Sequence, residues 1–182
     1  MTTEGMQGAV IQMVNHGLST GMLFLLVGMI YDRRHTRLIS EYGGLARVMP
    51  RFAVMFALAL LASVGLPGLN GFVGEFLILL GTFRSSVLHS WSYAIIAGSG
   101  VIFAALYLLG MYKRVFFGPI TNDKNLGLVD LNFREMAILG VFLLAIVWIG
   151  VHPSTFLDTS ALAVNDLLLR VRPLVASVSS LF

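Results

Sequence analysis

The strongest candidate for chemistry in this sequence is Glu75, a carboxylate inside a long apolar stretch. It is the only Asp or Glu within the four apolar blocks of the chain, and glycines stand near it at positions 71 and 74. An ionised carboxylate inside a bilayer is costly, so such a residue is partly protonated, paired with a cation or in contact with water. Glu75 is therefore predicted to be a protonatable relay group. The alternative is a structural Glu that caps a broken helix.

A second group of polar residues lies in the first apolar block at helical spacing. The positions i, i+4, i+7 and i+8 share one face of a helix, and they are occupied by Gln12, His16, Ser19 and Thr20. Asn15 lies beside them. Ser, Thr and Asn in membranes usually hydrogen-bond to a neighbouring helix. An ionisable His usually faces a cavity or a proton path, so His16 is predicted to be the second relay group, with the others as supporting polar residues.

The segment 52–83 that carries Glu75 is too long for one straight membrane helix. Its 32 residues would measure ~48 Å, against a hydrocarbon core of about 30 Å. Helix-breaking residues interrupt its middle, namely Gly65, Pro67, Gly68 and Gly71, because Pro lacks an N–H and Gly lowers the cost of non-helical backbone. We therefore predict half-helices at 52–64 and 71–83 with a break near 65–70. A long kinked helix, satisfied by its neighbours, is the alternative.

Unwound backbone at this depth is stable only where it is buried in protein or lines a wet cavity. In transporters, broken helices of this kind build ion sites. The break is thus expected to lie beside the candidate relay residues rather than against lipid.

The elements that must position these residues are membrane spans. Hydrophobic residues make up 57% of the chain and charged residues only 12%, whereas a soluble domain has about 25% charged residues. Apolar blocks of this length predict spans at about 8–31, 52–83, 92–112 and 136–151, followed by a tail, 152–182, that is expected to form a short interfacial helix. Tyr107 is the large polar side chain at depth in the third span. The predicted fold is an all-α integral membrane protein with about four transmembrane helices, in a single membrane domain, 1–182.

The distribution of basic residues predicts the orientation. The loops after the first and third spans hold nine Lys and Arg residues, whereas the second loop and the tail hold three. Because basic loops stay in the cytoplasm, the first and third loops are expected there and both termini outside.

Other chemistries find no support in the sequence. Cysteine is absent, so neither a disulfide framework nor a thiolate metal site can form. No phosphate loop, metal-ligand cluster or nucleophile–base pairing is present, and the net charge of +3 resides in loops between spans. We expect no covalent catalytic residue, no cofactor, no metal and no nucleic acid partner.

Three motifs carry a family resemblance: GAVIQMVNHGLS at 8–19, YDRRHTR at 31–37 and GLPGLNGFVGEF at 65–76. They closely resemble the subunit M family of bacterial NADH-quinone oxidoreductase (respiratory complex I), a family of antiporter-like, proton-translocating subunits. Nearly the whole chain takes part in the resemblance.

By this resemblance, Glu75 matches an essential carboxylate of the distal half-channel and His16 a histidine of the central polar axis. Family members are about three times longer, so the chain would correspond to their last four helices. The Glu of the family's first half, and the Lys residues on its broken seventh helix and on its eighth helix, have no counterpart here. In the sister subunits L and N the position of Glu75 is typically Lys.

The resemblance implies proton transfer coupled to quinone reduction elsewhere in a respiratory complex in the bacterial inner membrane. Expected partners are the other membrane subunits of complex I, the missing N-terminal half of the subunit and the lipid bilayer. The alternatives are an Mrp-type Na⁺/H⁺ antiporter subunit and a structural helix bundle without transport.

Overall fold

The computed structural model describes residues 2–85 and 90–179, and this part of the chain is all-helical. Residues 86–89 of the second loop and 180–182 of the predicted tail lie outside the described residues. Three helices are long and apolar enough to cross a membrane: α1 (Thr3–Arg34), the stretch Trp91–Phe116 of α5 (Ser90–Phe116) and α6 (Phe133–Val151). The predicted all-α membrane fold is confirmed.

These three helices extend beyond the predicted spans because the charge-free blocks mark the apolar core rather than the helix ends. Each helix continues until a cap satisfies its terminal backbone groups. Thr2 caps α1 by accepting a hydrogen bond from the N–H of Gly5. At the start of α6, Asn132 and Glu135 form a capping box, in which each side chain accepts a bond from the other residue's N–H.

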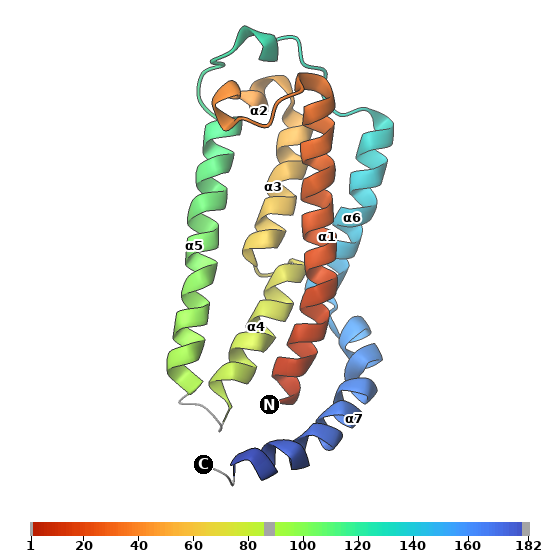
Figure 1. The fold of residues 1–182 in the computed structure, drawn as a ribbon. Helices are drawn as coiled ribbons and strands as arrows, with labels where there is room; N and C mark the ends of the chain where they lie inside the picture. The colour runs from red at the N-terminus through yellow and green to blue at the C-terminus, as the bar shows by residue number, and fades with distance from the viewer. Residues whose placement is uncertain (1, 86–89, 180–182) are drawn as a thin grey trace.

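The predicted break in the second span is confirmed. It separates α3 (Pro50–Val64), of 15 residues, from α4 (Asn70–Phe83), of 14 residues. Figure 1 shows the two half-helices one after the other, between α1 and α5. Each is too short to span the hydrocarbon core alone.

Glycine conformations explain why the helix stops where it does. Gly65 has a φ of 80°, and Gly68 has a φ of 91°, a region that residues with a Cβ rarely adopt. The N–H of Gly65 donates to the carbonyl of Ala62 at 3.3 Å, and the N–H of Leu66 donates to the carbonyl of Leu61 at 3.0 Å. This pair of bonds is a Schellman motif, so α3 ends in a satisfied C-cap before Pro67.

Small residues bring α1 and α4 close together along an antiparallel seam. A Cβ added at Gly8 would lie 2.7 Å from the Cβ of Leu77. Further along, the Cα of Gly5 lies where a Cβ of Gly81 would be. The absence of side chains at these positions lets the two backbones approach, as is common between membrane helices.

The hydrophobic core is most aromatic near the first and third loops. Phe116 of α5 stacks with Phe52 of α3, with ring centroids 5.7 Å apart, and makes a tilted contact with Phe56, with centroids 5.1 Å apart. Tyr112 stacks on Phe116 at 4.4 Å and donates its hydroxyl to the carbonyl of Ala53. These contacts hold α5 against the first half-helix.

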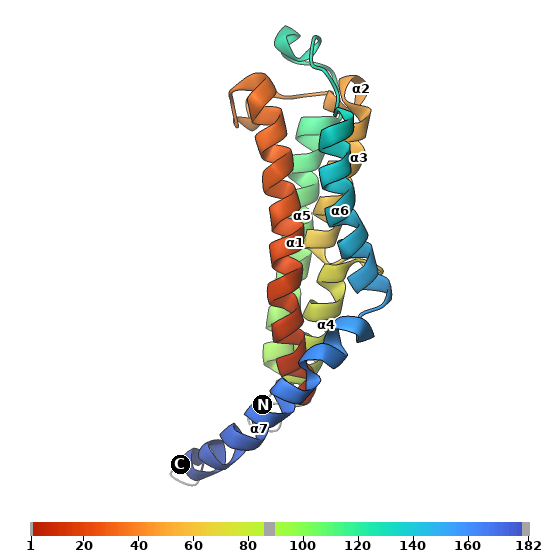
Figure 2. The same cartoon turned by 90° about the vertical axis from the view of Figure 1, so that its right-hand side faces the viewer.

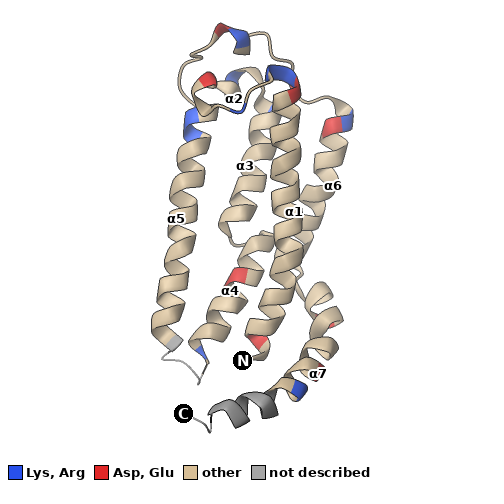
Figure 3. Cartoon of the chain, viewed as in Figure 1, with Lys and Arg blue, Asp and Glu red and all other residues tan. Residues whose placement is uncertain are grey.

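Most of the basic residues gather at this same end of the bundle (Figure 3). The loop after α1 contains a 3-10 turn, η1 (Ile39–Glu41), and a short helix, α2 (Leu45–Val48), and the loop after α5 contains η2 (Asp123–Asn125). The charge distribution agrees with the predicted orientation, which stays a prediction.

The tail forms a longer helix than expected. Helix α7 (Ser154–Ser179) has 26 residues and contacts α1, and in Figure 2 its far end projects away from the bundle. Val164 and Leu168 are buried, whereas Asp166 and Arg170 form an exposed ion pair at 2.9 Å. A buried apolar stripe opposite charged positions is the pattern of an amphipathic helix.

Candidate functional site

A polar cavity of about 220 Å³ lies where α1, α3, α4 and α5 meet. It brings together six of the residues that the sequence singled out: Gln12, His16, Ser19, Thr20, Glu75 and Tyr107. Gly71 of the break lines the same space. A cavity of this size has room for several water molecules.

Glu75 reaches the cavity from the second turn of α4 and is half-buried. A Cβ added at Gly65 would meet the carboxylate oxygen Oε2 of Glu75, with the carboxyl carbon at 3.1 Å. The carboxylate therefore lies against the backbone of the break. Within the described part of the chain no hydrogen bond reaches it, and the N-cap residue of α4, Leu69, provides no side-chain cap. This geometry does not correspond to a helix cap.

His16 and Thr20 line the cavity from α1. The ring Nδ1 of His16 lies 3.2 Å from the hydroxyl oxygen of Thr20, and the tautomer of the ring decides which of the two donates. His16 is exposed in this chain, so no described residue covers its ring on the side away from Thr20. An imidazole with one hydroxyl partner and one open side can accept and release a proton.

Gln12 connects this face of α1 to α4. Its amide oxygen occupies the place where a Cβ of Gly74 would lie, and it accepts a long hydrogen bond of 3.4 Å from the amide of Asn15. Gly74 is thus required by the close approach of Gln12, one residue before Glu75. Any side chain at that position would displace Gln12 from the cavity wall.

Tyr107 closes the α5 side and remains 66% exposed. It is the polar residue that α5 contributes to the cavity. Asn15 does not line the cavity, although it was grouped with the supporting residues. It is fully buried on the α4 side of α1.

Two polar residues near the site were not singled out from the sequence. Ser63, two residues before the break, lines the cavity, and among the described residues its buried Oγ has no hydrogen-bond partner. Asn70 is fully buried at the first position of α4. Both residues flank the glycine-rich break, and this position in the sequence could have identified them as candidates.

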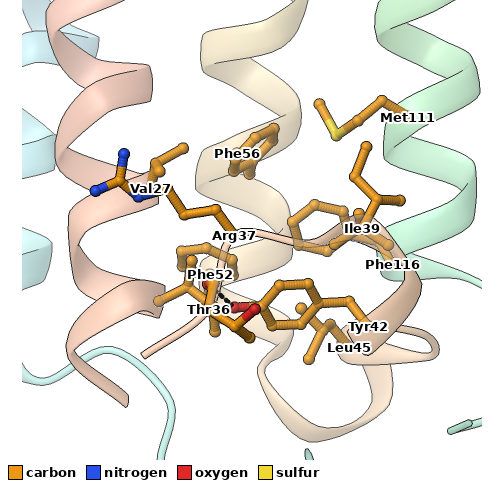
Figure 4. Close-up of a pocket in the computed structure, with 12 residues that line it drawn as sticks. Val27, Thr36, Arg37, Ile39, Tyr42, Leu45, Phe52, Phe56, Met111 and Phe116 are labelled. Atoms are coloured by element: carbon orange, nitrogen blue, oxygen red, sulfur yellow. Dashed lines mark hydrogen bonds between the residues drawn. The ribbon is translucent and has the colours of Figure 1, made fainter. Parts of the chain in front are cut away.

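The groove between α1 and α5 becomes apolar toward the basic end. A second cavity, of about 100 Å³, lies there among Val27, Met111 and the aromatic core (Figure 4). At its outer end the hydroxyl of Tyr42 donates to the carbonyl of Thr36 at 2.8 Å. Burial raises the pKa of Tyr42, which keeps this hydroxyl protonated. Apolar packing thus separates the polar cavity from the basic loops.

No metal centre is indicated in the described ranges, which contain no cluster of three or more His, Asp or Glu residues that could hold an ion. The chemistry that the cavity offers is proton exchange between a carboxylate, an imidazole, hydroxyls and water.

Comparisons with known proteins agree with this arrangement. A family model described as "NADH:quinone oxidoreductase/Mrp antiporter, TM" matches residues 1–102. The chain belongs to this family. Its membership confirms the resemblance that the motifs indicated.

Curated relatives in the family are named NADH-quinone oxidoreductase subunit M. The Rickettsia conorii protein is 43% identical over 169 residues, which cover 93% of this chain and 34% of the relative. The Rhodobacter capsulatus protein is 46% identical over 155 residues, covering 85% and 30% respectively. The Arabidopsis thaliana relative, NADH-ubiquinone oxidoreductase chain 4, is 42% identical and is covered to 33%. The chain therefore spans about a third of the length of these relatives.

Solved structures of family-like chains have the same helix arrangement. A chain of respiratory complex I from Thermus thermophilus with bound NADH matches 92% of this chain with a TM-score of 0.80 and 37% identity, and 35% of that chain is covered. A chain of the archaeal membrane-bound sulfane sulfur reductase matches 84% with a TM-score of 0.69 and 27% identity, and 25% of it is covered. The chain is thus a multi-pass membrane protein of the antiporter-like family.

Proposed function

We propose that this chain is the C-terminal part of a proton-translocating membrane subunit of a bacterial NADH-quinone oxidoreductase, with Glu75 and His16 as its proton-relay groups. The relatives named subunit M support the assignment, because they match up to 93% of this chain. In this proposal the oxidation of NADH and the reduction of quinone take place in other subunits. The chain is an enzyme component through the complex and holds no redox site of its own.

The observation that carries the proposal is the cavity around Glu75. It combines a carboxylate, a histidine and four hydroxyl-bearing residues with the unwound backbone of a broken helix. A proton can move along such a series through short transfers between side chains and water. The carboxylate changes its charge in this series, which makes it the group whose loss is most damaging.

The chain depends on partners to translocate protons. It has no Lys or Arg inside the predicted spans that could bias the charge of Glu75. The outward face of α5 is also uncovered in this chain, with Ile96, Phe103 and Leu106 more than 60% exposed. In this proposal, the N-terminal half of the subunit, neighbouring membrane subunits and lipid cover the exposed face of α5 in the bacterial inner membrane. The N-terminal half and the neighbouring subunits also supply the Lys or Arg side chains that bias the charge of Glu75.

An Mrp-type cation/proton antiporter subunit is the second candidate. The matching family model includes Mrp antiporters by its description. Co-purification separates the two: peripheral redox subunits indicate the oxidoreductase, whereas a set of membrane subunits alone indicates the antiporter.

The test of the proposal is Glu75→Gln in the assembled complex. The amide retains the volume but cannot exchange a proton, so NADH-driven proton uptake by inverted membrane vesicles should fall at least about tenfold. Glu75→Asp should be milder because it keeps a carboxylate, and His16→Ala should be milder because water can replace a relay imidazole. Asp123→Asn, an exposed carboxylate of the third loop, is the matched control. Normal proton uptake by Glu75→Gln at normal abundance of the complex would refute the relay role.

A further inference from the structure

Two asparagines that are 55 positions apart bind each other across the α1–α4 seam. The amide Nδ2 of Asn15 donates to the carbonyl of Asn70 at 2.7 Å, and the amide Nδ2 of Asn70 donates to the carbonyl of Asn15 at 3.1 Å. Both residues are 0% exposed. The pair is therefore reciprocal: each side chain binds the other residue's backbone.

This pair is costly to bury, which calls for a reason beyond packing. Among the described residues, neither Asn15 Oδ1 nor Asn70 Oδ1 has a hydrogen-bond partner. Buried polar atoms without a partner reduce stability, and apolar side chains of similar size avoid that penalty. Buried asparagines are known to fix the register between two packed helices, at a cost in stability.

The location of the pair determines what it fixes. Asn70 is the first residue of α4 and directly follows the break. No continuous helix joins α4 to α3 there, so the helix itself does not fix the position of α4. At its far end the seam also has a hydrogen bond from the hydroxyl of Thr2 to the carbonyl of Gly81 and an ion pair between Glu4 and Arg84. Between these ends the seam is largely formed by glycines, which allow close approach but have no side chains that specify register. The asparagine pair supplies directional contacts at the break.

The same backbone segments carry the relay groups. His16 follows Asn15 directly, and Glu75 lies five residues after Asn70. A one-residue change in register would turn α4 by about 100° relative to α1, because an α-helix has about 3.6 residues per turn. Such a rotation would move Glu75 out of the cavity it shares with His16.

We infer that Asn15 and Asn70 are positioning residues, whose reciprocal hydrogen bonds hold the Glu75 half-helix in register with the His16 face of α1. The inference rests on the proposed function of Glu75. It adds a role for two buried residues that do not line the relay cavity.

The test compares alanine variants in the assembled complex. Asn15→Ala and Asn70→Ala each remove one of the two reciprocal bonds. Asn15→Ala also removes the long bond to Gln12, so Asn70→Ala is the variant that tests the pair alone. Met22→Ala is the matched control, because Met22 is also 0% exposed on α1 but packs in the apolar core away from the break. The readouts are the protons taken up per NADH oxidised by inverted vesicles and the pH profile of that ratio.

We expect each asparagine variant to lower the proton ratio at least threefold and to displace its pH profile, while Met22→Ala changes only the abundance of the complex. A displaced profile reports an altered environment of the titrating groups of the cavity. These groups are Glu75 on α4, His16 on α1 and Tyr107 on α5, whereas α3 contributes Ser63, which does not titrate. The double variant should resemble the single variants, because both bonds fix one register.

The outcomes separate the inference from the proposed function. If Glu75→Gln abolishes proton uptake but both asparagine variants behave like Met22→Ala, the positioning role is refuted and the relay stands. If Glu75→Gln is silent, the relay itself is refuted. Where the alanine variants do not assemble, Asn15→Ser and Asn70→Ser are measured in the same way. Failure of these to assemble, with Met22→Ala assembling normally, would make the pair a folding determinant and overturn the inference.

Discussion

Asp130 provides a sharp test of how the first half-helix is held. Its carboxylate accepts the N–H of Arg51 at 2.8 Å and the N–H of Phe52 at 3.0 Å, from a position 78 or more residues away in the sequence. The N-cap residue of α3, Met49, has no side-chain cap. Asp130 therefore acts as the N-cap of α3 from the third loop.

The size of the effect follows from the burial of these donors. Arg51 is exposed, so water can replace its bond, whereas Phe52 is 1% exposed and its N–H would be left unsatisfied. Loss of an N-cap costs about 0.5–2 kcal/mol, and loss of a negative charge at a helix N-terminus costs about 0.3–1 kcal/mol. Asp130→Ala should therefore lower the free energy of unfolding by about 1–3 kcal/mol.

The assay is thermal unfolding of the detergent-solubilised protein within its complex. A soluble domain of this size loses roughly 2–4 °C per kcal/mol, so Asp130→Ala should lower the midpoint by several degrees. Asp130→Asn retains one acceptor oxygen and should lose less. Asp123→Ala removes an exposed charge of the same loop and should have little effect. Equal midpoints for Asp130→Ala and Asp123→Ala would refute the capping role.

Three further changes probe other contacts. Gly71→Ala should abolish assembly, because the new methyl group would meet a carbonyl of the last turn of α3. Gly140→Ala is the control, because a methyl group there has open space. In the same thermal assay its stability should stay unchanged or rise by up to about 1 kcal/mol. Glu135→Gln should lower the unfolding midpoint, because it removes the charge from a two-bond pair with Arg33 at 2.7 and 2.8 Å; an unchanged midpoint would refute that contribution. A cysteine introduced at Thr36 should be labelled from the cytoplasmic side, and labelling from the opposite side alone would reverse the predicted orientation.

The break and the face of α1 could be predicted because both depend on short-range sequence. Gly65 and Pro67 determine the end of α3 locally, through a left-handed glycine and a missing N–H donor. The spacing of Gln12, His16 and Thr20 determines which side chains share a face. The structure then places this face on the same cavity as Glu75.

The long-range partners could not be predicted in this way. The Asn15–Asn70 pair and the bonds from Asp130 to the start of α3 connect residues more than 50 positions apart. They depend on how far one helix slides along another, and neither composition nor periodicity fixes that distance. The length of α7 was also underestimated, because its mixed apolar spacing and two arginines obscured the helical pattern.

Two long-range contacts anchor the two half-helices separately. On one side of the break, Asp130 ties the start of α3 to the third loop. On the other side, Asn15 and Asn70 tie the start of α4 to α1. The positive-φ glycines at 65 and 68 let the connecting turn form without steric strain. Both anchors lie outside the break itself. Glu75 therefore depends both on the contacts of α4 with α1 and on its packing against the backbone of the break.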